Sequence, residues 1–295
     1  MANNISFAEK YLGDIDKIIV QSAKTGFLAD NSFKPKFNGS KTVYLPEMDM
    51  DGLGDYSRTS GYPKGDSSLV YTPYTLEQER GKQLFLDAQD ADESGIGDLA
   101  GKLVGEFVRT KVIPETDAYN ISKLYGISKT ASNTKVLNTA KAVASLLEII
   151  NACEEAMEYD TANIVALVNP TLYNLLQTST ELQRYLSVSD FTQGGITVKV
   201  KNLNGCPIIP VASGRMKSAY TFGTNGFTPV SDAVDINAIV MPKDSASIVK
   251  KVDKCQILSP EQVEDYDAYK INFRLYYDLI CKTSRKKTVF TLTNK

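Results

Sequence analysis

The sequence predicts an α+β fold, in which helices and strands occupy separate stretches of one chain. Two stretches, Ile96–Val108 and Val136–Glu158, place apolar residues at helical spacing. A third stretch, Tyr269–Ile280, is rich in aromatic and β-branched residues, which is typical of a long strand. With 295 residues, the chain can bury a sizeable core in one large domain or two modest ones.

The N-terminal quarter predicts an arm followed by a long hairpin. Asn4–Ala23 carries apolar residues on one broad helical face. A short amphipathic helix has little core of its own, so it must lie on its own domain or on a neighbouring molecule. Lys41–Leu45 and Ser68–Leu76 predict two strands, with the polar, glycine-rich stretch Met48–Lys64 as the loop between them. A hairpin alone is marginal in water, so this one needs its own domain or a partner.

Leu69–Gly126 joins the return strand of the hairpin to the first long helix. An acidic run suits the start of that helix, where the helix dipole is positive: Asp87, Asp90, Asp92 and Glu93. The apolar stripe Ile96–Val108 is expected to pack on the chain's own outer sheet. Pro114 is expected to end the helix, because proline lacks an amide hydrogen and clashes with the preceding turn.

The second half alternates helices with strands. After the helix Val136–Glu158, Asn163–Val168 predicts a buried strand, and Pro170 begins a helix that should run to about Leu186. Further strands are predicted at Gly195–Val200, Cys206–Val211, Ala238–Met241, Ser247–Val252 and Thr288–Leu292. We expect the chain to leave an outer region near Thr130 and to return to it near Pro242.

The composition excludes several classes of function. The chain has 33 basic and 35 acidic residues, and a net charge of −2 argues against a protein that grips nucleic acid by its phosphates. The absence of histidine removes Ser-His-Asp and Cys-His catalysis and most transition-metal sites. No apolar run is long enough to cross a membrane, and no signal peptide is recognisable. The four cysteines, Cys153, Cys206, Cys255 and Cys281, lie far apart in the sequence. This wide spacing favours buried thiols over disulfide bonds or a zinc site.

The predicted hairpin loop holds a partial metal-binding pattern. Asp49, Asp51 and Asp55 resemble part of a calcium loop. Their spacing does not complete an EF-hand and the distal glutamate is missing, which favours a solvated turn at the hairpin tip. Gly52 and Gly54 do not form a dinucleotide-binding fingerprint, because no third glycine follows.

A small basic cluster lies near the C-terminus and consists of Lys282, Arg285, Lys286 and Lys287. It suits nucleic acid or an acidic partner, but a solvated loop is favoured because short basic patches are common. The chain contains neither a P-loop nor a G-x-S-x-G motif. We therefore predict no catalytic, cofactor-binding or metal-binding residues and no cofactor.

The order of these elements resembles that of the major capsid proteins of tailed phages, which have the Hong Kong 97-like fold. The resemblance is carried by a strand entering at Leu76–Arg80, the run Phe85, Asp87 and Asp90, the acidic pair Asp92–Glu93, the helix exit Phe107–Val108 with the run Val112–Tyr119, and the late strand Arg274–Asp278. In element order the resemblance spans nearly the whole chain.

The resemblance implies an N-terminal arm (1–40), an extended β-hairpin loop (41–77), a peripheral domain with a long spine helix (78–129), an axial domain (130–241) and return strands of the peripheral domain (242–295). A hinge is expected near Glu77–Gln83, where it would let one sequence fit positions of different curvature.

The implied function is that of a phage major capsid protein, without enzymatic activity and without a membrane. It would self-assemble into pentamers and hexamers that form an icosahedral or prolate head around double-stranded DNA. Expected partners are a separate scaffolding protein, a portal protein and decoration proteins, and the expected location is the virion, assembled in the host cytoplasm. Lys64 is the lysine available for a covalent cross-link in the loop tip, but no matching acceptor position is found, so cross-linking is not expected.

Two alternatives stay open. The first is an encapsulin-like nanocompartment, which shares the fold but encloses cargo enzymes. The second is a histidine-independent enzyme with a pocket in the axial region, which the missing catalytic motifs argue against.

Overall fold

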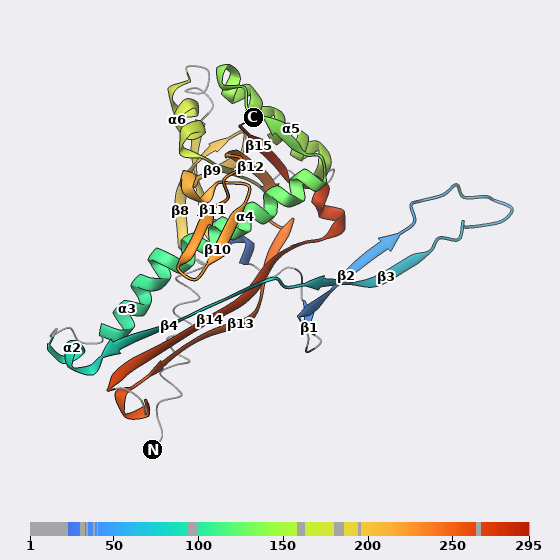
Figure 1. Ribbon diagram of the computed structural model, residues 1–295. Helices are drawn as coiled ribbons and strands as arrows, with labels where there is room; N and C mark the ends of the chain where they lie inside the picture. Colours follow the sequence, from blue (N-terminus) through green and yellow to red (C-terminus); the bar gives the residue numbers. More distant parts are fainter. Residues whose placement is uncertain are drawn as a thin grey trace.

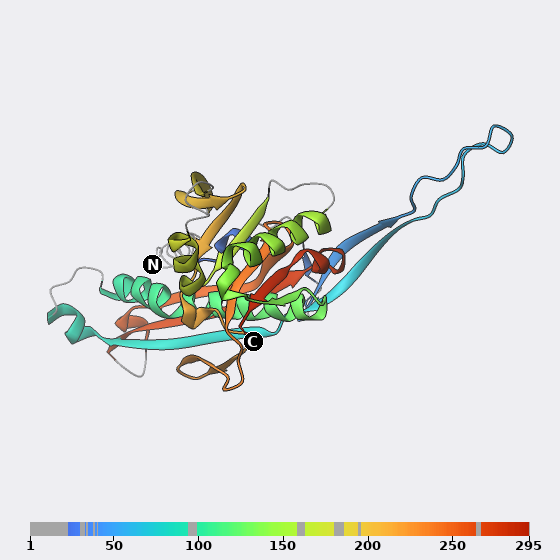
Figure 2. The same cartoon turned by 90° about the horizontal axis from the view of Figure 1, so that it is seen from above.

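The structure is a computed structural model that describes residues 23–29, 33, 35–37, 39, 41–93, 99–157, 163–179, 186–193, 196–263 and 267–294. The predicted arm helix Asn4–Ala23 lies almost wholly outside these residues. Figures 1 and 2 show a body of sheets and helices, from one end of which a long hairpin projects.

The outer part of the body is a three-stranded antiparallel sheet in the order β13-β14-β4. Its strands are β13 (Ala246–Leu258), β14 (Ala268–Cys281) and β4 (Gln78–Asp87). Helices α3 (Leu99–Phe107) and α4 (Ile113–Thr130) run along it (Figures 1 and 2). Val104 and Val108 are buried in one cluster with Ile271 and Phe273 of β14, so the predicted packing of the helix stripe on the outer sheet is confirmed for the described residues.

Pro114 does not end the spine helix, and this prediction was wrong. A π-helical turn, Val108–Val112, connects α3 to α4, and the amide of Ile113 donates to the carbonyl of Val108 five residues earlier. Pro114 therefore falls in the first turn of α4, where a missing amide hydrogen costs little. Helical structure continues from Leu99 to Thr130.

The inner part of the body is a seven-stranded sheet in the order β5-β15-β12-β6-β9-β8-β7. The strands are β5 (Thr134–Val136), β6 (Ile164–Val168), β7 (Leu186–Gln193), β8 (Ile196–Leu203), β9 (Cys206–Pro210), β12 (Ile236–Pro242) and β15 (Phe290–Thr293). Every residue of β6 and β12 is buried. Val165 and Leu167 enter the cluster shared with the outer sheet, whereas Ala166 and Val168 enter the cluster under α5 (Ala142–Met157) and α6 (Pro170–Thr178).

Several boundaries in the second half differ from the prediction. The helix predicted from Val136 begins later, because Thr134–Val136 forms β5 and pairs in parallel with β15. Helix α5 starts after a 3-10 turn, Thr139–Lys141, that Asn138 caps. Helix α6 ends at Thr178, and Leu186 already belongs to β7. The C-terminal strand β15 pairs with β12 in the inner sheet, whereas the prediction placed it among the return strands of the outer region.

The remaining short elements are the 3-10 turns η1 (Gly26–Ala29), η4 (Ser213–Arg215), η5 (Pro260–Gln262) and η6 (Thr283–Thr288), the helix α2 (Ala88–Glu93), the strand β1 (Lys36–Phe37) and the small hairpin β10 (Tyr220–Gly223) with β11 (Gly226–Pro229). All four cysteines are buried and unpaired, as predicted. Burial raises the pKa of Cys255 to about 11 and those of Cys153, Cys206 and Cys281 to about 12.

Candidate functional site: the projecting hairpin and its anchor

The projecting hairpin consists of β2 (Thr42–Met50) and β3 (Ser67–Thr75), which pair from Thr42↔Thr75 to Met50↔Ser67. The loop was predicted to begin at Met48, but β2 continues to Met50, so the observed loop is shorter than the predicted one. Beyond its base, the hairpin exposes large apolar side chains: Met48 (74%), Met50 (71%), Leu53 (107%) and Tyr62 (87%). Such a concentration of exposed apolar residues is typical of a surface that another molecule covers.

The base of the hairpin packs on the chain's own outer sheet. Val43 and Leu45 of β2 and Leu76 are buried in one cluster with residues of β13 and β14. The partners from the sheet are Val249, Tyr276 and Ile280. The hairpin is therefore folded against its own body at one end, while its other end has no such support among the described residues.

Glu47 marks the point where the buried base gives way to the exposed part. Its carboxylate accepts hydrogen bonds from Tyr74 Oη at 2.8 Å, Thr72 Oγ1 at 3.1 Å and the amide of Thr283 at 3.2 Å. Burial alone would raise the pKa of Glu47, but these hydrogen bonds and the charge of Lys282 lower it overall. The two strands and η6 are thereby linked at this level.

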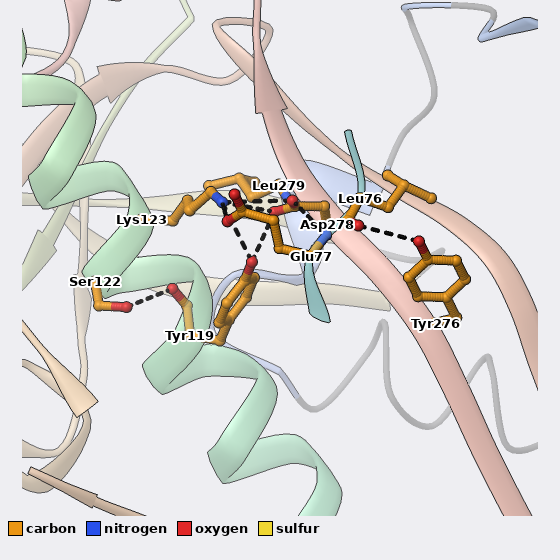
Figure 3. A network of polar contacts seen from close by, with 8 residues as sticks. All are labelled: Leu76, Glu77, Tyr119, Ser122, Lys123, Tyr276, Asp278 and Leu279. Atoms are coloured by element: carbon orange, nitrogen blue, oxygen red, sulfur yellow. Dashed lines mark hydrogen bonds and ion pairs between the residues drawn. The ribbon is translucent and has the colours of Figure 1, made fainter. Parts of the chain in front are cut away.

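A polar network fixes the junction between the hairpin and β4 (Figure 3). Tyr276 Oη donates to the carbonyl of Leu76 at 3.0 Å, and the amide of Glu77 donates to Asp278 Oδ2 at 3.1 Å. Asp278 Oδ1 also accepts from Tyr119 Oη of α4 at 2.9 Å. Burial raises the pKa of Asp278, which is 2% exposed, against the opposing effect of the nearby Lys123.

The predicted hinge segment Glu77–Gln83 lies next to this network and almost wholly within β4. From Gln78 onward that segment is a regular strand, with Cα partners in β14 from Gln78↔Tyr277 to Asp87↔Ala268. Bending within it would break backbone hydrogen bonds of the ladder. Leu76 and Glu77 connect β3 to β4, and Tyr276 and Asp278 of β14 hold both residues in place.

A second buried polar site ties the first described residues to the spine. Asp117 is fully buried and accepts from the amides of Lys24 at 3.1 Å and Thr25 at 3.0 Å, and from Thr25 Oγ1 at 2.8 Å. Arg215 of η4 completes the site with an ion pair at 3.0 Å. Burial raises the pKa of Asp117 although Arg215 and the hydrogen bonds oppose the shift. Sequence reasoning assigned no role to Asp117.

The structure places the three candidate calcium ligands on the hairpin. Asp51 Oδ2 accepts from the amide of Asp66 at 2.8 Å and so closes the tip, while Asp49 and Asp55 are exposed. Among the described residues, no three His, Cys, Asp or Glu side chains converge as metal ligands would. Lys64 is exposed in the same tip, and its cross-linking stays untested.

The acidic run falls at the end of β4 and in α2, before the described start of the spine helix at Leu99. Asp87 ends β4 and its Oδ1 accepts from the amide of Gln89 at 2.9 Å, so it caps the separate helix α2. In the basic cluster, Arg285 pairs with Asp244 at 3.1 Å and Lys282 Nζ lies 4.8 Å from the ring centre of Phe33. These two basic groups contact their own chain.

Among the described residues, no helix is both long and apolar enough to span a bilayer.

No protein-family model and no curated protein sequence matches the chain. Solved structures do match it. The mature capsid of bacteriophage PhiM1 superposes with a TM-score of 0.58 at 13% identity, over 91% of this chain and 84% of that one. The capsid of cyanophage P-SCSP1u gives 0.57 at 14% identity, over 88% and 85%.

A virus-like particle from Pyrococcus furiosus also matches, with a TM-score of 0.54 at 10% identity over 98% of this chain and 99% of that one. At these identities the matches establish the fold alone. The chain has the Hong Kong 97-like fold, as predicted.

Proposed function

We propose that this chain is the major capsid protein of a tailed phage, a subunit that assembles with copies of itself into a closed shell. The observation that carries the proposal is the projecting hairpin, whose base is anchored in its own body and whose apolar tip is exposed. Copies that cover one another's tips would remove this apolar surface from water, at about 25 cal/mol per Å². The fold shared with phage capsids supports the same conclusion.

Assembly would proceed through pentamers and hexamers, whose rings require complementary, head-to-tail surfaces. Each hairpin supplies one weak contact, and many such contacts add through multivalency. Because the base is fixed by Leu45, Leu76 and the network around Asp278, adaptation to different curvature would occur beyond Glu47.

The shell would be an icosahedral or prolate head around double-stranded DNA, found in the virion after assembly in the host cytoplasm. With a net charge of −2, the subunit would enclose DNA without sequence-specific binding. A separate scaffolding protein, a portal protein and decoration proteins would be its partners. The role requires no bond chemistry, and the matching structures are two phage capsids and a virus-like particle.

An encapsulin-like compartment around cargo enzymes is the second candidate. It is supported by the match to the Pyrococcus furiosus particle, which covers almost the full length of both chains. Neighbouring genes separate the two: terminase and portal genes support the phage head, whereas a peroxidase or ferritin-like gene supports the compartment.

Electron microscopy of the purified full-length chain, alone and with a co-expressed scaffolding protein, tests the proposal. Closed shells or ring-shaped capsomers are expected, and nuclease-protected DNA in particles from infected cells would identify a phage head. A chain that stays monomeric at every concentration and in both preparations would overturn the proposal.

A further inference from the structure

A groove of about 600 Å³ opens between the outer sheet and the spine within a single copy of the chain. Its walls come from β4, β14, the π-helical turn and the turn of the small hairpin β10–β11, which are distant in the sequence. In Figure 2 this small hairpin lies on the side of the body opposite α5 and α6. Small-molecule sites have volumes of about 300–1,000 Å³, so the groove has the size that a small molecule needs.

Much of the groove lining is apolar and aromatic. It includes Leu84, Phe107, Phe227 and Phe273. Phe107 and Phe273 meet edge to face, with ring centres 5.8 Å apart. Phe273 is buried, whereas Leu84, Phe107 and Phe227 stay partly exposed. An apolar ligand would remove the exposed parts of these side chains from water, and a ring would add the contacts that aromatic pairs favour.

The charged residues that line the groove leave it positive. They are Arg80, Lys82, Lys111 and the acid Glu115. Arg80 pairs with Glu115 at 2.5 Å and also donates to the carbonyl of Gly223 at 2.7 Å, so these two charges are matched. Lys82 and Lys111 are exposed, and within the described part of the chain neither has a carboxylate at ion-pair distance. An acid group on a ligand would supply the missing counter-charge and accept a charge-assisted hydrogen bond.

Lys111 belongs to an unusual stretch of backbone. It lies in the π-helical turn Val108–Val112, and its neighbours Thr110 and Val112 line the groove with it. A π-helical turn adds a residue to a helical turn and so changes the direction in which the side chains around it point. Such turns are rare and are frequent at functional sites. This feature of the backbone therefore singles out the groove independently of its apolar lining.

We propose that the groove binds a small amphipathic anion, a molecule with an apolar ring or chain and one acid group. The apolar part would lie against Phe107, Phe227 and Phe273, and the acid group would pair with Lys82 and Lys111. The bound molecule would connect β4 to the spine at the π-helical turn and would stabilise the folded chain. Because the site lies within one copy of the chain, this proposal is separate from the proposed function.

Two dyes that differ in one acid group test the proposal. Anilinonaphthalene sulfonate has an aromatic body and a sulfonate, and phenylnaphthylamine has the same aromatic body without the sulfonate. Each dye is titrated into the unassembled full-length chain, and binding is followed by dye fluorescence. We expect one saturable site that binds the sulfonate dye about tenfold more tightly than the neutral dye. Equal affinities for the two dyes would overturn the proposed recognition of the acid group.

Substitutions locate the site. Lys82→Gln/Lys111→Gln should weaken binding of the sulfonate dye about tenfold and leave the neutral dye unchanged, because the counter-charge alone is removed. Both lysines are exposed, so their replacement should not impair folding. The matched control, Lys102→Gln/Lys254→Gln, changes two exposed lysines outside the groove and should leave both affinities unchanged. A groove variant that binds the sulfonate dye as tightly as this control would contradict the proposal.

The exposed hairpin tip is a second surface on which an apolar dye can settle. Met48→Ser/Met50→Ser removes two apolar side chains from it and lies outside the groove, so it should leave the saturable site unchanged. Phe227→Ser in the groove should weaken binding of both dyes severalfold. If the methionine variant abolished binding and Phe227→Ser did not weaken it, the dyes would bind the tip and the proposal would be wrong. The proposed function would stand, because shell formation tests it separately.

Discussion

Strand β6 and the hairpin β2–β3 are built from similar apolar residues but have opposite surroundings. In β6, helices α5 and α6 cover one face and the cluster shared with the outer sheet covers the other, so all five residues are buried. In the hairpin, burial ends near Leu45, and Met48 and Met50 on the same strand are more than two-thirds exposed. The chain thus covers both faces of β6 by itself, whereas it leaves the outer half of the hairpin exposed.

Under the proposed function, this difference separates the residues that stabilise folding from those that stabilise assembly. Residues covered by their own chain contribute to the free energy of unfolding, whereas residues covered only by another copy contribute to association. Substitutions of the first kind of residue should therefore change the free energy of unfolding, and substitutions of the second kind should change assembly. The following predictions run from the largest expected effect on unfolding to the smallest.

Leu167→Ala should give the largest loss. Leu167 is fully buried in a strand packed on both faces, so the surroundings cannot close over the cavity. We expect the free energy of unfolding of the unassembled chain to fall by about 3–4 kcal/mol, measured by urea denaturation. A loss below about 1 kcal/mol would contradict the packing described for β6.

Leu45→Ala should cost less, about 2–3 kcal/mol, because its cluster at the hairpin base is smaller and can relax toward solvent. Hydrogen exchange should accelerate in β2 and β3 but not in β6. Equal acceleration of hydrogen exchange in the hairpin strands and in β6 would show that the base of the hairpin is not a separate cluster.

Asp117 should give a pH-dependent effect. Burial raises the pKa of Asp117 in the folded chain above its ordinary value of 3.8, so between the two values the folded chain holds a proton that the unfolded chain has lost. The stability contributed by that proton is present below pH 3.8 and is lost as the pH rises through the raised pKa.

Relative to Asp117→Asn, the free energy of unfolding of the wild type should therefore decrease with pH in this window, by at most about 1.4 kcal/mol per pH unit. Urea denaturation at successive pH values measures the difference. A difference that grows with pH would show that Arg215 and the amides of Lys24 and Thr25 outweigh burial.

Met48→Ser/Met50→Ser should change the free energy of unfolding by less than about 0.5 kcal/mol, because both side chains are exposed. The fraction of chain in particles should nevertheless fall severalfold, as measured by sedimentation. Ser60→Ala, a polar and exposed position of the same tip, is the control and should alter neither measurement. Normal assembly of the double methionine variant would break the distinction between the two regions.

Local patterns were sufficient to predict much of the fold. The run Asn163–Val168 predicted β6 from its continuous apolar character. The helix stripe was correctly assigned to the outer sheet through Val104 and Val108. Each of these signals is contained within a few neighbouring residues.

Features that depend on distant partners were missed. Pro114 on its own predicts a helix end, because it has no amide hydrogen to donate. The π-helical turn Val108–Val112 precedes it and places it in the first turn of α4, where that donor is not needed. The resemblance placed a strand entering at Leu76–Arg80, but the largely polar run up to Asp87 continues as a strand because β14 pairs with it. Asp117 gives a faint signal, a lone acid beside Ala118 and Ile121 on a buried helix face, but its partners Thr25 and Arg215 are about ninety residues away in each direction.

The four buried thiols have a consequence for the durability of any particle. With pKa values between about 11 and about 12, roughly one thiol in ten thousand to one in a hundred thousand is ionised at pH 7. Oxidants and reductants that act on thiols should therefore leave these four cysteines unchanged. Disulfide bonds through these cysteines would then not hold the copies of a particle together, so a reducing agent should not dissociate it.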